Sequence, residues 1–137
     1  MSAPITPQTA LVYIMVIVAA ADRDMTDREL MTIGEVVRSL PVFRDFNENL
    51  LPTLAEDCAQ LLQQDDGLET VLSLARNALP AKLRETAYAV AVDVAAADLR
   101  AGQEEIRLLQ ILQDRLEVDG LVAAAIERAA RARFTAL

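Results

Sequence analysis

An apolar, alanine-rich run that ends in an aspartate occurs twice in this chain and constrains its fold most strongly. The copies are Ala19-Ala20-Ala21-Asp22 and Ala95-Ala96-Ala97-Asp98. A glutamate follows each aspartate at the same spacing, as Glu29 and Glu105, so the copies are offset by 76 residues (98 − 22 and 105 − 29). Such self-similarity indicates a duplicated structural unit. We therefore predict two equivalent helix hairpins, over about residues 8–40 and 81–117.

The rest of the chain also predicts helices. Apolar residues make up 53% of the 137 residues and aromatic residues only 4%, and the dominant apolar types, Ala and Leu, are strong helix formers. No stretch alternates with period two, as a half-buried strand would. The sequence predicts an all-α fold of about seven helices in a single compact domain covering residues 1–137.

Helix boundaries follow from capping residues. Thr6 precedes Pro7, and Thr26 precedes Glu29 in the pattern of a capping box. Asn49 is expected to cap the third helix, Asp66 together with Glu69 the fourth, and Asp119 the seventh. The first helix, from Pro7 to Ala21, and the fifth, from Pro80 to Ala97, are apolar nearly all round, which predicts that they form the buried centre.

Net charge and missing residue types exclude several functions. The net charge is −8, which disfavours nucleic acid and anionic membranes as partners and is compatible with cations or a basic partner. The first apolar run is too short to span a bilayer, so no membrane insertion is expected. The single cysteine, Cys58, indicates a reducing, cytoplasmic location. Because the chain has no histidine, Ser-His or Cys-His catalysis and histidine-ligated metals are excluded.

The repeat carboxylates form the candidate site. Asp22 and Asp98 fall at the C-terminal ends of helices, where negative charge is disfavoured, so a positive group should face them. One interpretation is a divalent cation such as Ca²⁺, Mg²⁺ or Mn²⁺, held by oxygen ligands. The candidate metal ligands are Asp22, Asp24, Glu29, Asp98 and Glu105. The other interpretation is that these carboxylates only cap helices.

Other polar residues have simpler structural interpretations. Asp93 lies inside the apolar fifth helix, and a hydrogen bond to an arginine or a helix end would account for it. Arg128, Arg131 and Arg133 are expected on a solvated helix face. Tyr13 and Tyr88 stand at nearly equivalent places in the two repeats and are expected in the core with their hydroxyl groups at its rim.

With these residues identified, the chain resembles the tellurite-resistance TerB family over nearly its whole length. It is also similar to the N-terminal helical domain of the membrane-anchored co-chaperone DjlA. The resemblance is carried by the Ala-Ala-Asp end of the first helix, Met25-Thr26, Glu29, Leu40-Pro41-Val42-Phe43, Leu79-Pro80, residues 83–89, residues 93–98, Glu104-Glu105 and residues 124–128.

The resemblance implies an all-α fold of about seven helices and an association with tellurite and other stress responses. It also implies cation binding by Asp22, Glu29, Asp98 and Glu105. The family often has glycine after each aspartate, whereas this chain has Arg23 and Leu99, so the turn geometry must differ.

Three functions follow as hypotheses. The first is a non-enzymatic TerB-like module that binds a divalent cation or a basic partner in the cytoplasm. The second is a protein interaction or scaffold module, acting through an apolar groove or a homodimer face, in which the Asp and Glu pairs are only helix caps. The third, a hydrolase or oxidoreductase with a carboxylate-bound metal, is disfavoured because the chain has no histidine and no glycine-rich phosphate loop.

Overall fold

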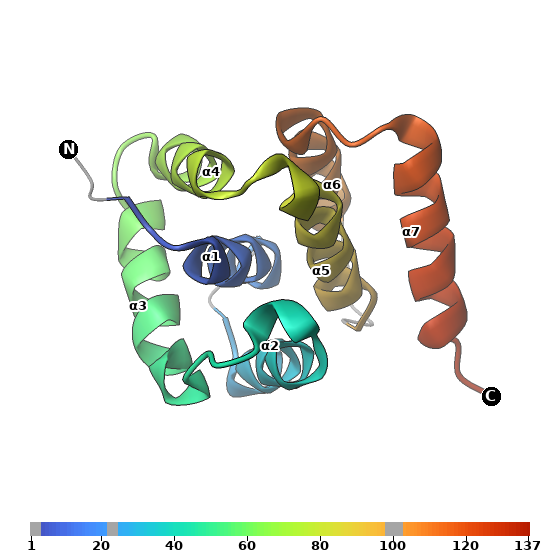
Figure 1. Ribbon diagram of the computed structural model, residues 1–137, viewed down its shortest axis with the longest axis horizontal. Coiled ribbons are helices and arrows are strands. Elements are labelled where there is room, and N and C mark those ends of the chain that lie inside the picture. Colours follow the sequence, from blue (N-terminus) through green and yellow to red (C-terminus); the bar gives the residue numbers. More distant parts are fainter. Residues whose placement is uncertain (1–3, 22–24, 98–102) are drawn as a thin grey trace.

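The computed structural model describes residues 4–21, 25–97 and 103–137, and this part of the chain forms seven α-helices and no strand. Asp22, Asp24 and Asp98 lie outside the described residues. The prediction of an all-α fold with seven helices is confirmed (Figure 1). The helices are α1 (Pro7–Ala19), α2 (Asp27–Ser39), α3 (Leu51–Leu62), α4 (Gly67–Ala78), α5 (Arg84–Ala97), α6 (Gln103–Leu116) and α7 (Gly120–Arg133).

The helix α1 is the buried centre of the first half of the chain, which comprises α1 to α4, as predicted. Thr6 caps it by accepting a hydrogen bond from the Thr9 N–H, and Pro7 takes the first helical position, where its missing donor costs nothing. Every residue from Ala10 to Ala19 is buried. In Figure 1, α2, α3, α4 and α5 surround α1. An apolar surface around the whole circumference explains why α1 needs neighbours on all sides.

The helix α5 is the buried centre of the second half of the chain, which comprises α5 to α7. It packs against α1 on one side and against α6 and α7 on the others. Seven of its residues are buried, between Ala87 and Ala95. Asp93, a charged residue within this apolar helix, forms an ion pair with Arg133 of α7. This confirms the prediction that a bond to an arginine compensates the Asp93 carboxylate. The two central helices thus pack directly on each other, as a duplicated unit with two buried centres requires.

A linker follows α2. The helix ends at Ser39, before Pro41, and residues 40–50 connect it to α3. Within the linker, Phe43 is buried and its ring meets that of Phe46 edge to face, with the centroids 5.5 Å apart. The guanidinium of Arg38 pairs with Glu48 at 2.7 Å. The linker is therefore held against both α2 and α3 rather than left in solvent.

Two predicted caps are wrong. Asn49 does not cap α3. Instead, Asn47 caps a short 3-10 turn, Glu48–Leu50, that leads into the helix. Asp66 precedes α4 but makes no capping hydrogen bond, because its backbone is left-handed, with φ of 55°.

The geometry at Asp66 follows from a close approach of the chain to itself. A Cβ on Gly67 would lie 2.4 Å from the Leu61 carbonyl oxygen, so the tight joint between α3 and α4 needs glycine there. The Pro80 boundary is also shifted, since a 3-10 turn, Ala81–Leu83, comes before α5.

Charged residues join the helices at the start of α5. Glu117, just after α6, pairs with both Arg76 of α4 and Arg84 of α5. Arg115 of α6 pairs with Glu69 of α4. These ion pairs are partly exposed, so they fix orientation more than they stabilise the fold.

Among the helices of the described residues, none combines the length and the apolar character needed to cross a lipid bilayer.

Candidate functional site

Of the five predicted site residues, the structure describes Glu29 and Glu105. Each occupies the third position of its helix, Glu29 in α2 and Glu105 in α6. The repeat therefore predicted their register correctly. The other three, Asp22, Asp24 and Asp98, lie outside the described residues, so the structure does not test whether they approach these glutamates.

Glu29 belongs to a complete capping box. Its Oε1 accepts the Thr26 backbone N–H at 2.9 Å and the Thr26 hydroxyl at 3.0 Å. The Glu29 N–H in turn donates to the Thr26 hydroxyl oxygen at 3.2 Å. This arrangement satisfies backbone donors that the helix itself cannot. The prediction that Thr26 and Glu29 form a capping box is thus confirmed.

Glu105 has a different environment from its repeat counterpart. It is 3% exposed and is the one charged side chain classed as buried among the described residues, whereas Glu29 is half-buried. A buried carboxylate must be compensated by hydrogen bonds or opposite charge, and Glu105 is engaged within the protein. The difference follows from packing, because α6 lies along α5 more extensively than α2 lies along α1.

The described carboxylates do not assemble into a metal site by themselves. Within residues 4–21, 25–97 and 103–137, no three Asp, Glu or Cys side chains converge in a way that could hold a metal ion. A cation site with three carboxylate ligands at the joints would therefore have to include Asp22, Asp24 or Asp98.

A groove opens between α6 and α7 in the second half. Its floor is formed by α5, with Tyr88, Val92 and Ala96, and its volume is about 650 Å³. One wall carries Ile106 and Leu109 of α6, and the other carries Ala130 of α7 and Phe134, the residue that follows α7. We call this cavity the α6–α7 groove. The second hypothesis named an apolar groove without a location, and the residues that line this one were not predicted from the sequence.

The rim of the α6–α7 groove carries two accessible apolar side chains among polar ones such as Gln110 and Thr135. Ile106 is 56% exposed and Phe134 is 41% exposed, although both are large apolar side chains. Single exposed apolar residues are ordinary. Here two of them face one cavity with an apolar floor, a combination typical of a surface that binds another molecule.

Three charged side chains also line the α6–α7 groove: Glu105, Glu127 and Arg131. Glu127 accepts a hydrogen bond of 2.6 Å from the Tyr88 hydroxyl. Burial, together with this carboxylate, raises the pKa of Tyr88. The tyrosine therefore stays neutral at physiological pH and acts as a fixed donor in the floor.

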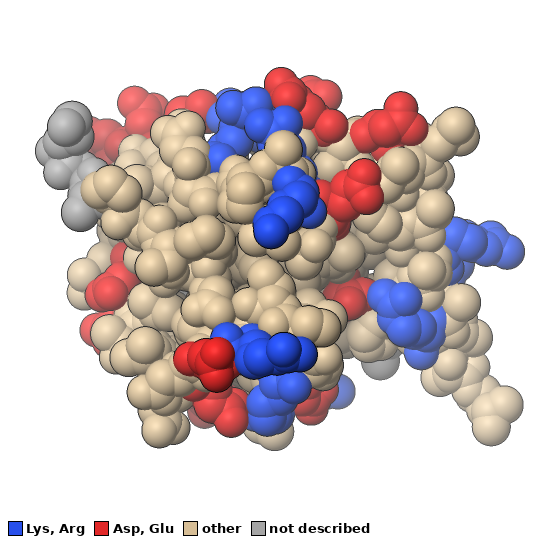
Figure 2. Space-filling view, in the orientation of Figure 1, with Lys and Arg blue, Asp and Glu red and all other residues tan. Residues whose placement is uncertain are grey.

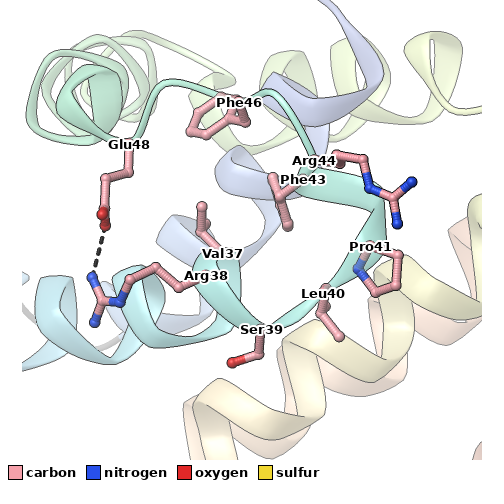
Figure 3. A pocket seen from close by; sticks show the side chains of 9 residues that line it. All are labelled: Val37, Arg38, Ser39, Leu40, Pro41, Phe43, Arg44, Phe46 and Glu48. Atoms are coloured by element: carbon pink, nitrogen blue, oxygen red, sulfur yellow. Dashed lines mark hydrogen bonds and ion pairs between the residues drawn. The ribbon is translucent and has the colours of Figure 1, made fainter.

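A second cavity, of about 430 Å³, lies beside the linker of the first half. Figure 3 shows it between α2 and the linker, with Val37 on the helix, Phe43 and Phe46 on the linker, and the Arg38–Glu48 ion pair at one side. Phe43 is buried and its ring meets that of Phe46, so the linker forms one wall of this cavity.

The environment of Cys58 does not suit a nucleophile. Cys58 is buried, and burial raises the pKa of its thiol to about 12, which keeps it protonated and unreactive. On the face shown in Figure 2, acidic and basic side chains are interspersed instead of gathered into a patch of one sign. Such a face does not resemble the basic stripe of a nucleic-acid interface.

Comparison of the chain with protein-family models, with curated proteins and with solved structures finds no match.

Proposed function

We propose that this protein is a non-enzymatic helical module of the cytoplasm that binds another protein through the α6–α7 groove. The observation that carries the proposal is the apolar floor of the groove beneath an accessible rim, with Ile106 56% exposed and Phe134 41% exposed. Covering such side chains removes apolar area from water, at about 25 cal/mol per Å².

The environment of Glu29 supports this choice between the two main hypotheses. Its hydrogen bonds to Thr26 give it a sufficient structural role. The absence of histidine from the sequence and the protonated, buried Cys58 also favour a binding protein over an enzyme.

The test uses the intact chain as bait for partners from its host cells. Ile106→Ser and Phe134→Ser remove the apolar rim without disturbing the core. Met31→Ser and Leu121→Ser are matched controls, because these side chains are 66% and 84% exposed and do not line the groove. We expect a partner that wild type and both controls retain and that the two rim variants lose. Retention by all five proteins would contradict the proposal.

Cation binding at the hairpin joints is a second candidate function. It is supported by the duplicated Asp22/Glu29 and Asp98/Glu105 pairs, by the register shared by Glu29 and Glu105, and by the resemblance to the TerB family. On this proposal the joints bind Ca²⁺, Mg²⁺ or Mn²⁺ during tellurite or related stress.

Calorimetry with each of the three cations tests the second candidate. Binding should weaken at least about tenfold in Asp22→Ala and in Asp98→Ala, since each removes a ligand, and should persist in Asp114→Ala, which alters an exposed aspartate in the body of α6. Equal heats of binding in all four proteins, or no heat of binding in wild type, would contradict cation binding at the hairpin joints.

A further inference from the structure

Another cavity, of about 320 Å³, lies where α1, α3 and α4 meet, and Figure 1 shows these three helices side by side. Its apolar lining is Ile5, Leu61 and Leu74, and its polar lining is Tyr13, Asp57, Gln60 and Gln64. We call it the Tyr13 cavity. Its volume is at the lower end of the range for ligand pockets, so it suits a molecule or a side chain with few heavy atoms.

The hydroxyl group of Tyr13 is the feature that points to a ligand. Tyr13 is 5% exposed, yet its hydroxyl makes no hydrogen bond to another described residue. Burial, together with Cys58 and Asp57, raises the pKa of Tyr13, so the hydroxyl lies near these residues of α3. Buried tyrosine hydroxyls usually have a partner, as Tyr88 has in Glu127. The Tyr13 hydroxyl is therefore available to a molecule in the cavity.

The charge around the Tyr13 cavity favours a cation. Residues 45–75 contain seven Asp or Glu and no Lys or Arg. Glu48 and Glu69 pair with arginines from other segments, whereas Asp57 has no ion pair within the described part of the chain. The cavity also lies at the C-terminal end of α3, whose last turn has no basic residue. Because a helix C-terminus stabilises positive charge, a cationic ligand is favoured over an anionic one.

Hydrogen-bonding capacity selects among cations. A primary ammonium group has three N–H donors and no acceptor. The polar lining supplies acceptors, namely the Asp57 carboxylate, the Tyr13 oxygen and the side-chain amide oxygens of Gln60 and Gln64. The apolar lining suits the alkyl chain that carries an ammonium group, whereas a bare metal ion would leave that side of the cavity unused.

We propose that the Tyr13 cavity binds a primary alkylammonium group. The ammonium donates hydrogen bonds to the Asp57 carboxylate and to the Tyr13 oxygen, and the alkyl chain lies against Leu61 and Leu74. A free amine and the lysine side chain of another protein both supply this chemistry. The site is separate from the α6–α7 groove, because the two cavities share no described lining residue.

The test is a titration of the isotope-labelled full chain with butylammonium chloride, followed by NMR chemical shifts. Saturable shifts are expected at Tyr13, Asp57 and Leu74. Asp57 is exposed, so salt should weaken the binding and the dissociation constant should be millimolar. 1-Butanol and sodium butyrate are probes with the same chain. Butanol should bind at least about fivefold more weakly, since charged donors form the stronger hydrogen bonds, and butyrate should not bind, because the carboxylate repels it.

Variants locate the binding in the cavity. Tyr13→Phe removes an oxygen acceptor and Asp57→Asn removes a charge, and each should weaken butylammonium at least about fivefold. Glu56→Gln is the matched control, because it removes the same charge from the neighbouring exposed position of α3, outside the cavity lining. It should change the affinity by less than about twofold. Equal weakening by Asp57→Asn and Glu56→Gln would overturn the proposal, since general acidity would then attract the probe.

A capped tripeptide with one lysine between two glycines distinguishes the two sources of the ammonium group. Binding at least as tight as that of butylammonium identifies a lysine side chain, and binding of butylammonium alone identifies a free amine; either result supports the site. Equal affinities for butylammonium and butanol, or no saturable shift at the cavity with either amine, overturn it. None of these outcomes affects partner binding in the α6–α7 groove, which the Ile106 and Phe134 variants test.

Discussion

The buried hydroxyl of Tyr88 donates a 2.6 Å hydrogen bond to Glu127 and so joins α5 to α7 in the floor of the α6–α7 groove. Further along the same two helices, Arg133 and Asp93 form a second polar contact. The two contacts fix α7 on α5, and this leaves α7 separated from α6 by the groove. Both walls are therefore positioned by packing against α5.

Removing the Tyr88 hydroxyl should lower stability. In Tyr88→Phe the floor loses its hydrogen bond to a charged acceptor, and we expect the free energy of unfolding to fall by about 1.5–3 kcal/mol. Urea denaturation followed by circular dichroism measures it. Tyr13→Phe is the matched control, because the Tyr13 hydroxyl donates no hydrogen bond to another described residue. An equal loss in both variants would contradict a specific role for the Tyr88–Glu127 bond.

The raised pKa of Tyr88 predicts a loss of stability at alkaline pH. Burial and the Glu127 carboxylate hold the Tyr88 proton more tightly in the folded protein than in the unfolded one. The resulting stabilisation is complete below pH of about 10, where the unfolded tyrosine starts to titrate, and it is lost as pH rises further. The free energy of unfolding should fall more steeply above pH 10 in wild type than in Tyr88→Phe. Parallel pH profiles would rule this out.

The capping box at Thr26 separates a structural role of Glu29 from a metal-binding one. Thr26→Ala should cost about 1 kcal/mol of stability. Glu29→Gln should cost little, because glutamine also accepts the Thr26 N–H in a capping box. If Glu29 also binds a cation, however, Glu29→Gln should remove most of the affinity measured by calorimetry. Unchanged stability in Thr26→Ala would show that the cap contributes nothing.

The helix caps and the burial of whole helices could be predicted from the sequence, because they depend on residues that are close together in the chain. Thr6, Thr26 and Asp119 cap their helices as expected, since a cap is a contact between a side chain and backbone within three residues. Thr26-Asp27-Arg28-Glu29 carries the whole capping-box pattern in four residues. The burial of α1 and α5 followed equally directly from apolar residues around their circumference.

Contacts between distant segments could not be predicted in this way. Asp66 fails as a cap because the approach of Gly67 to the end of α3 forces a left-handed backbone. Glu29 and Glu105 match in sequence yet differ in burial, because α6 packs more extensively on α5 than α2 on α1. The α6–α7 groove depends on the packing of three helices.

Two glycines provide a matched test of the tight joint. Gly67→Ala forces a Cβ to within 2.4 Å of the Leu61 carbonyl oxygen, and we expect a loss of at least about 2 kcal/mol. Gly120→Ala places its Cβ in open space at the first position of α7, where alanine should be neutral or stabilise by up to about 1 kcal/mol. Thermal denaturation ranks the two variants. Tolerance of Gly67→Ala would contradict the packing of α3 against α4.

The central claim is that partner binding takes place in the α6–α7 groove. Chemical-shift mapping of the isotope-labelled chain, before and after addition of the partner that it captures from its host cells, tests it most directly. The account predicts that the largest shifts fall on Val92, Ile106 and Phe134, and that residues around Phe43 do not move. Shifts concentrated at Phe43 and Val37, or at the hairpin joint beside Glu29, would contradict it.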